Sequence, residues 1–173
     1  MEIFEILNEG KRNQMQGLEP VVQLALDEPA RLEEVVGFSF DATPKIAARA
    51  VWVLRQVGER EPKLLMPFKE YIIERLDRDL IWEVRSEFCH VLPKLDFSEE
   101  ELKMVVAFFE KGLQSDSRIV IAWSLDGWYE LSKKYALLIP GFERMLDQAL
   151  AHQFPAVRAR AKAIQRDFLK RKK

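Results

Sequence analysis

Large apolar residues return along this chain at a nearly fixed interval. Four of them close successive predicted helices, at separations of 36, 37 and 37 residues: Phe40, Leu76, Leu113 and Leu150. A residue pair in the helix that follows has separations of 36, 38 and 37: Arg49-Ala50, Arg85-Ser86, Trp123-Ser124 and Arg160-Ala161. A fixed period of this length indicates repeated units that bury their apolar faces only by stacking on one another.

The repeated units are predicted to be pairs of helices. Apolar residues recur three and four positions apart almost throughout, and the alternation typical of half-buried strands is absent. Ser98 and Glu101 have the spacing of a capping box at the start of one helix. Proline, glycine and short polar clusters give first helices near 30–39, 63–76, 98–114 and 138–151, and second helices near 44–59, 79–94, 117–134 and 155–170.

The length of the chain favours one domain. Its 173 residues, of which 48% are hydrophobic, are enough to build a continuous core. We therefore predict a single domain over 1–173. Residues 1–27 supply one or two helices that cap its open end, and about four repeats follow, at 28–60, 61–95, 96–135 and 136–173.

The second helices carry sequence patterns of a known repeat family. The runs Trp82-Glu83-Val84-Arg85 and Pro155-Ala156-Val157-Arg158-Ala159-Arg160-Ala161 resemble the Val-Arg core of the second helix in HEAT repeats, and Ala50-Val51-Trp52-Val53-Leu54 is similar to short bacterial HEAT-like proteins. The resemblance covers roughly residues 20–170, but the third repeat has Ile121-Ala122-Trp123 instead, and the period is shorter than the roughly 40–47 residues of HEAT units. It implies a right-handed α-solenoid of about four HEAT-like (armadillo-type) helix pairs with N-terminal capping helices, forming a curved scaffold that binds a partner.

Charge is unevenly distributed along the chain. The net charge of −1 indicates no general attraction to nucleic acid or to an anionic membrane. Residues 156–173, however, carry eight basic residues and one acidic residue, which leaves −8 on the rest of the chain.

The sequence favours a cytoplasmic protein. Its single cysteine, Cys89, cannot form an intramolecular disulfide, and its first residues are acidic where a signal peptide is basic. No stretch approaches the ~18 uninterrupted apolar residues that a membrane-spanning helix requires, so we expect no membrane association.

No arrangement of residues predicts catalysis. Cys89 and His90 are adjacent in sequence and lie about 100° apart around a helix, so they cannot form a pair of nucleophile and base. Zinc-binding spacings are absent, and the seven glycines do not cluster into a phosphate-binding loop. We therefore expect a non-enzymatic protein without a metal or cofactor.

Three tryptophans point away from the main apolar stripe of their helices. On a helical wheel, Trp52, Trp82 and Trp123 lie roughly 160–200° from that stripe. The HEAT resemblance implies that second helices line a concave surface, where these aromatic side chains suit a protein- or peptide-binding site together with Arg55 and Asp126. The alternative is that the tryptophans fill the joints between neighbouring repeats, and the sequence leaves both interpretations open.

The last predicted helix supports a second hypothesis. Arg158, Lys162 and Arg166 follow one another at four-residue spacing and can track a phosphate backbone, which makes nucleic acid the alternative partner. Trp123-Ser124-Leu125-Asp126 also resembles, faintly, the aromatic and acidic residues of HEAT-like DNA glycosylases, although those enzymes need a broadly positive groove. A polar outer face, which a terminal repeat needs for solubility, explains the same basic residues without any ligand.

Overall fold

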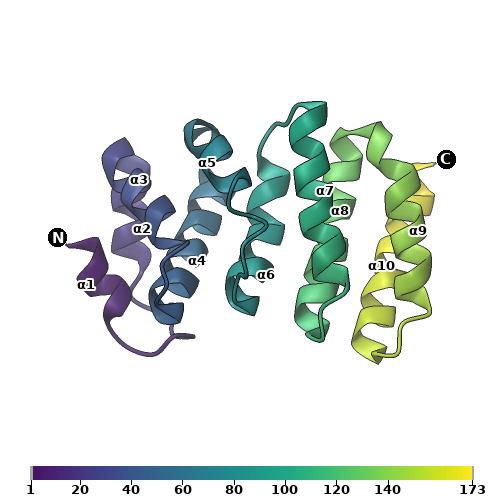
Figure 1. Cartoon of the computed structure of the whole chain (residues 1–173), viewed down its shortest axis with the longest axis horizontal. Helices are drawn as coiled ribbons and strands as arrows, with labels where there is room; N and C mark the ends of the chain where they lie inside the picture. Colours follow the sequence, from purple (N-terminus) through teal and green to yellow (C-terminus); the bar gives the residue numbers. More distant parts are fainter. Residues whose placement is uncertain (1, 173) are drawn as a thin grey trace. The chain divides into compact units, whose positions relative to one another are not determined.

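Ten α-helices make up the part of the chain that the computed structural model describes, residues 2–172 (Figure 1). They are α1 (Ile3–Asn8), α2 (Glu19–Asp27), α3 (Pro29–Phe38), α4 (Pro44–Arg60), α5 (Lys69–Ile73), α6 (Trp82–Val91), α7 (Glu99–Leu113), α8 (Arg118–Lys134), α9 (Ile139–Leu150) and α10 (Pro155–Arg171). Short 3-10 segments lie at Pro62–Phe68, Leu92–Lys94 and Ala136–Leu138. Residues 2–172 contain no strand, so the predicted all-α class is confirmed.

The helices form two compact units. Unit 1 extends to Val105, and unit 2 starts at Val106, within α7. In unit 1, α4 packs against α3 and α6, and both α1 and α2 also contact α4. In unit 2, α10 packs against α8 and α9. The second helices α4 and α6 are therefore neighbours in unit 1, as α8 and α10 are in unit 2, while the single domain over 1–173 stays a prediction.

The helix boundaries follow the predicted pairs. Helices α4, α8 and α10 begin and end within one residue of their predicted limits, and residues 1–27 contain α1 and α2. The first helix of the second pair differs, because Pro62–Phe68 is a 3-10 segment and only Lys69–Ile73 is α-helical. Pro67 lies inside that segment, and a proline has no N–H to donate to an α-helical ladder.

Local sequence signals account for many of the helix starts. A proline stands in the first turn of α2, α3, α4, α9 and α10, where its missing N–H costs no hydrogen bond. The capping box before α7 is present in both directions. The N–H of Glu101 donates to Ser98 Oγ at 3.3 Å, and the N–H of Ser98 donates to Glu101 Oε2 at 2.7 Å.

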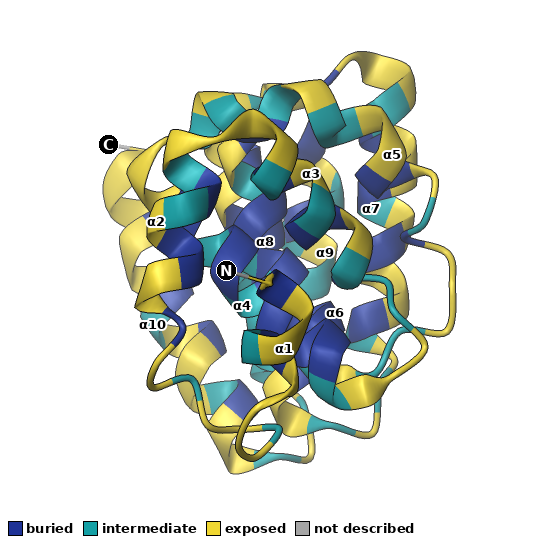
Figure 2. Ribbon diagram, turned by 90° about the vertical axis from the view of Figure 1, so that its left-hand side faces the viewer, coloured by how far each residue is buried: buried dark blue, intermediate teal, exposed yellow. Residues whose placement is uncertain are grey.

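The core of unit 1 is built on one stripe of α4. Phe40 stacks on the buried Phe88 of α6, with 5.2 Å between the ring centroids. Figure 2 shows that individual helices carry buried residues, in dark blue, on one side and exposed residues, in yellow, on the other. The stripe residues of α4 are fully buried: Ile46, Ala50, Val53, Leu54 and Val57.

The core of unit 2 is aromatic. The ring centroid of Phe142 lies 5.2 Å from that of Tyr129 and 5.4 Å from that of Phe168. Phe109 stacks on the buried Trp128, with 6.5 Å between the ring centroids. Such ring pairs contribute roughly 0.5–1.5 kcal/mol beyond their area burial.

A glycine brings α7 close to α8 in unit 2. A Cβ atom at Gly112 would lie 2.1 Å from Ser124 Oγ, so only a residue without a side chain fits at this contact.

Candidate partner-binding surface

The three tryptophans that the sequence places off the apolar stripe differ in exposure. Trp82, the first residue of α6, is 48% exposed, whereas Trp52 and Trp123 are half-buried. The fourth tryptophan, Trp128, is part of the core. Of the predicted aromatic set, Trp82 is therefore the side chain most available to a partner.

Arg55 joins α4 to α6 in unit 1. Its Nε donates to Glu59 Oε1 at 2.8 Å, and its Nη1 donates to Glu87 Oε2 at 3.2 Å. Burial raises the pKa of the Glu87 carboxyl, and Arg55 offsets only part of that rise. We use the name α4/α6 face for Arg55 and Glu87 together with the nearby residues of the two helices that lie off the core stripe or carry charge: Trp52, Trp82 and Glu83.

In unit 2, Asp126 joins α8 to α10. Nε of Arg160 donates to both of its oxygens, at 2.7 Å to Oδ1 and 2.9 Å to Oδ2. Burial raises the pKa of Asp126, and this ion pair opposes the rise. Trp123, Asp126 and Arg160 form the α8/α10 face. The sequence predicted the first two residues and did not predict that Arg160 would pair with Asp126.

A buried arginine on α4 holds the N-terminal segment in place. Arg49 is only 3% exposed, and its Nη atoms donate to the main-chain carbonyl oxygens of Ile6 at 3.2 Å, Lys11 at 3.3 Å and Gln14. Burial lowers the pKa of the Arg49 guanidinium. The segment that it contacts, residues 10–17, lies between α1 and α2 and is called the strap below.

Two further contacts tie this N-terminal region to α4 and α6. Nζ of Lys45 donates to the carbonyl oxygen of Asn8 at 2.5 Å, and Nη2 of Arg12 forms an ion pair with Glu83 Oε2. These contacts were not predicted from the sequence. A signal was present, because Arg49 occupies the repeat position that also holds Arg85 and Arg160.

The predicted phosphate-contacting residues of α10 separate into two kinds. Arg158 is half-buried, and its Nη1 donates to the carbonyl oxygens of His152 at 2.7 Å and Gln153 at 3.0 Å, at the end of α9. Lys162 and Arg166 are exposed, and neither has an ion-pair partner among the described residues.

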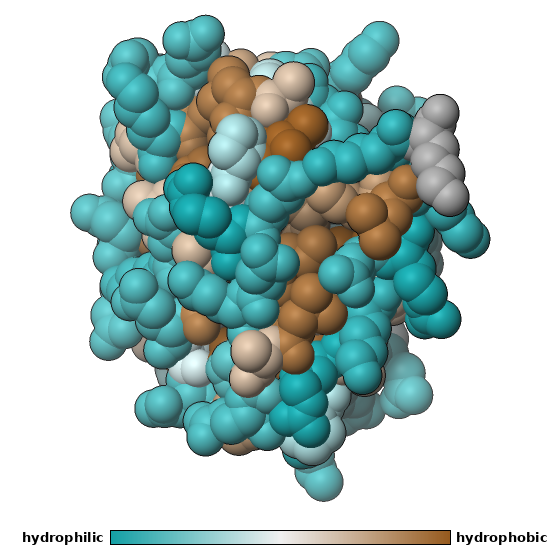
Figure 3. All heavy atoms as spheres, turned by 90° about the vertical axis from the view of Figure 1, so that its right-hand side faces the viewer, coloured by the Kyte–Doolittle hydropathy of each residue, from teal (hydrophilic) through white to brown (hydrophobic). Residues whose placement is uncertain are grey.

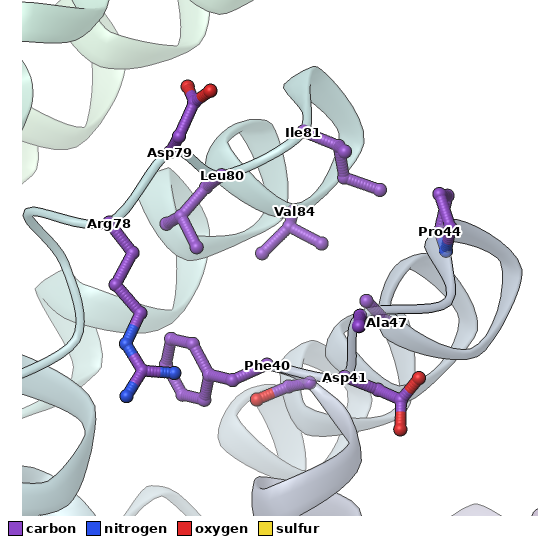
Figure 4. Close-up of a pocket in the computed structure, with 11 residues that line it drawn as sticks. Phe40, Asp41, Pro44, Ala47, Arg78, Asp79, Leu80, Ile81 and Val84 are labelled. Carbon is purple, nitrogen blue, oxygen red and sulfur yellow. The ribbon is translucent and has the colours of Figure 1, made fainter.

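A cavity of about 190 Å³ opens in unit 1 beside the first turns of α4 and α6. Phe40, Leu80 and Val84 supply apolar walls, and the carboxylates of Asp41 and Asp79 point outward (Figure 4). In unit 2, Figure 3 shows an apolar band bordered by hydrophilic residues. A shallow hollow there is lined partly by Leu146, Phe168 and the exposed Leu169.

The described residues offer little for bond-making chemistry. Cys89 is buried, and its Sγ contacts the carbonyl oxygen of Arg85 at 3.3 Å. Residues 2–172 contain no group of three His, Cys, Asp or Glu side chains placed to hold a metal ion. Within the same range, no helix is both long and apolar enough to cross a membrane.

Comparison with known proteins identifies the fold. No protein-family model matches the chain, and no curated protein matches its sequence. Among solved structures, a crystal structure of computationally designed armadillo repeat proteins for modular peptide recognition is similar over 92% of this chain and 78% of that chain, with a TM-score of 0.55 and 16% sequence identity. The chain therefore has an armadillo/HEAT-like helical repeat fold, and the predicted α-solenoid class is confirmed.

Proposed function

We propose that the protein is a non-enzymatic scaffold that binds a protein or peptide partner through its second helices. The observation that carries the proposal is Trp82, a large aromatic side chain exposed at the start of α6. Exposed tryptophans and arginines are the residue types that contribute most to protein interfaces. The similar designed armadillo proteins were made for peptide recognition, which supports the same use of this fold.

The α8/α10 face is proposed as a second contact surface. It combines the half-buried Trp123 with the Asp126–Arg160 ion pair. Each member of such a pair can exchange its intramolecular partner for a backbone amide or a charged side chain of a bound peptide. The partner class is thus a polypeptide with both aromatic or aliphatic and charged side chains.

Peptide selection from a random phage-displayed library tests this function. We expect the intact protein to enrich related sequences, and the Trp82→Ala variant to bind the selected peptides at least tenfold more weakly. Met104→Ala is the matched control, because Met104 is 46% exposed but lies on the first helix α7. Asp126→Asn tests the α8/α10 face in the same way. The proposal fails if no sequence is enriched, or if none of the face variants weakens binding relative to Met104→Ala.

Nucleic-acid binding is the alternative function, and the exposed Lys162 and Arg166 of α10 favour it. Fluorescence anisotropy with labelled single- and double-stranded DNA at low salt tests it directly, with Lys162→Glu/Arg166→Glu as the charge-reversed variant. A glycosylase would also release free base from damaged DNA. Such activity requires Asp126 as the acidic residue of the active site, and both of its carboxylate oxygens already accept hydrogen bonds from Arg160.

A further inference from the structure

The strap contacts Arg49 of α4 and Glu83 in the first turn of α6, and Glu83 belongs to the face for which we propose a partner. We propose that the strap is an internal occupant of that site, and that the partner is a turn-forming peptide bearing an arginine, which displaces the strap and pairs with Glu83. This inference rests on the proposed function and names the class of peptide that the α4/α6 face takes.

The hydrogen bonds from Arg49 to the strap are made to its main chain and are largely independent of the strap's side chains. Arg49 donates to the carbonyl oxygens of Lys11 and Gln14, which converge because the N–H of Gln14 donates to the carbonyl oxygen of Lys11 at 3.0 Å and closes a turn; any peptide in the same turn can supply them. The charged end of Arg49 is held at the site by burial, so its donors stay directed at main-chain oxygens whichever polypeptide lies there.

One side-chain contact gives the site its chemical preference. Arg12 pairs with Glu83, whose side chain is 18% exposed, while Trp82 next to it in sequence is open to solvent. The carboxylate of Glu83 suits a guanidinium, which can form two parallel hydrogen bonds to it.

With the strap in place, two buried hydrogen-bond donors at this site have no acceptor among the described residues. Arg12 reaches Glu83 through Nη2, and its buried Nε has no hydrogen-bond acceptor among the described residues. The same is true of the buried Nε of Arg49. Buried donors are normally satisfied, so a peptide that supplied the missing acceptor and paired with Glu83 through two nitrogens would replace the strap with a net gain of hydrogen bonds.

The strap can leave without opening the core. It is bounded by Gly10 and Gly17, whose φ angles of 68° and 87° make them the two residues with positive φ in the described range. Most of its side chains are exposed, while Leu7 before it and Leu18 after it are fully buried. Rotation at the two glycines therefore allows the strap to move while the core residues on either side stay in place.

A peptide copying residues 10–17, with a fluorescent label, tests the site directly by anisotropy. In the intact protein the strap competes, so the Arg12→Ala variant is expected to bind this probe at least tenfold more tightly than the intact chain. Adding Glu83→Gln to Arg12→Ala removes the gain, and a probe with alanine in place of its arginine binds neither protein. Equal binding by the intact chain and Arg12→Ala, or no binding by either, overturns the inference.

Movement of the strap supplies a second measurement. A spin label at Asn13→Cys, in a background with Cys89→Ala, is expected to become more mobile when the probe peptide binds. Peptides selected for Trp82-dependent binding separate the two proposals. If they bind tightly, lack arginine and leave the label unchanged, the strap inference is wrong and the proposed function stands. If no peptide depends on Trp82 but the strap peptide still frees the label, the broader proposal fails instead.

Discussion

The same repeat position is buried in unit 1 and more exposed in unit 2. In unit 1 the position holds Arg49 and Arg85, which are only 3% and 6% exposed. In unit 2 it holds the half-buried Trp123 and the exposed Arg160, which pairs with Asp126 on the neighbouring helix. An arginine at a fixed place in a helical repeat is therefore buried or exposed according to what covers it, and in unit 1 the N-terminal segment covers Arg49.

The largest expected effect concerns the tryptophans of the two units. Trp128→Ala removes a side chain from the aromatic core of unit 2 and is expected to lower the free energy of unfolding by about 3–5 kcal/mol. Trp82→Ala in unit 1 should lower it by less than about 1 kcal/mol, because that side chain is exposed. Urea denaturation followed by circular dichroism measures both, and similar losses would contradict the difference in burial.

Arg49 and Arg160 form a matched pair for the second prediction. Arg49→Met removes the donors to three main-chain carbonyl groups and is expected to cost about 2–3 kcal/mol of stability. Arg160→Met breaks one ion pair at the surface, worth less than about 1 kcal/mol. The same denaturation experiment applies. If Arg160→Met proves the more costly, the N-terminal segment does not depend on Arg49 as described.

Two helical glycines give a smaller contrast. Gly112→Ala places a methyl group against Ser124, 3.1 Å from its Cβ, and is expected to destabilise unit 2 by about 1–2 kcal/mol. Gly58→Ala meets the mobile end of Leu65 at 3.0 Å, so the gain in helix propensity, up to about 1 kcal/mol, can offset the contact. Thermal unfolding of both variants provides the measurement, and equal melting temperatures would argue against close packing at Gly112.

The smallest effect is a pH dependence from Glu87 of unit 1. Its pKa is raised in the folded state, so folding favours the protonated form, and this contribution to stability is lost as pH rises through the folded pKa. Relative to the intact chain, Glu87→Gln should therefore gain stability between pH 4 and pH 7, on the order of 1 kcal/mol or less. Denaturation midpoints across that range measure the gain. A constant difference would show that Arg55 fully compensates the burial.

Much of the fold could be predicted because its signals are local. The apolar period, the prolines in first helical turns and the capping box at Ser98 depend on residues a few positions apart. The 3-10 segment around Pro67 was predicted as part of a helix, because proline in a first turn and proline in an interior look alike until the helix start is known.

The candidate site could be predicted only in outline. The helical wheel placed Trp52, Trp82 and Trp123 away from the main apolar stripe, but it could not rank their exposure. Exposure depends on which neighbouring helix lies beside each side chain, and that neighbour is tens of residues away in the chain.

By itself, the sequence determined that the chain forms paired helices with a period near 37 residues and which stripe of the second helices is apolar, since both follow from the spacing of apolar residues. Only the tertiary structure decided that Arg49 is buried beneath the strap and that Arg160 pairs with Asp126. It also decided that Arg158 donates to carbonyl oxygens just after α9. These outcomes depend on contacts 5 to 43 residues apart in sequence, for which a long charged side chain has several possible partners. The packing of the helices selects one of them.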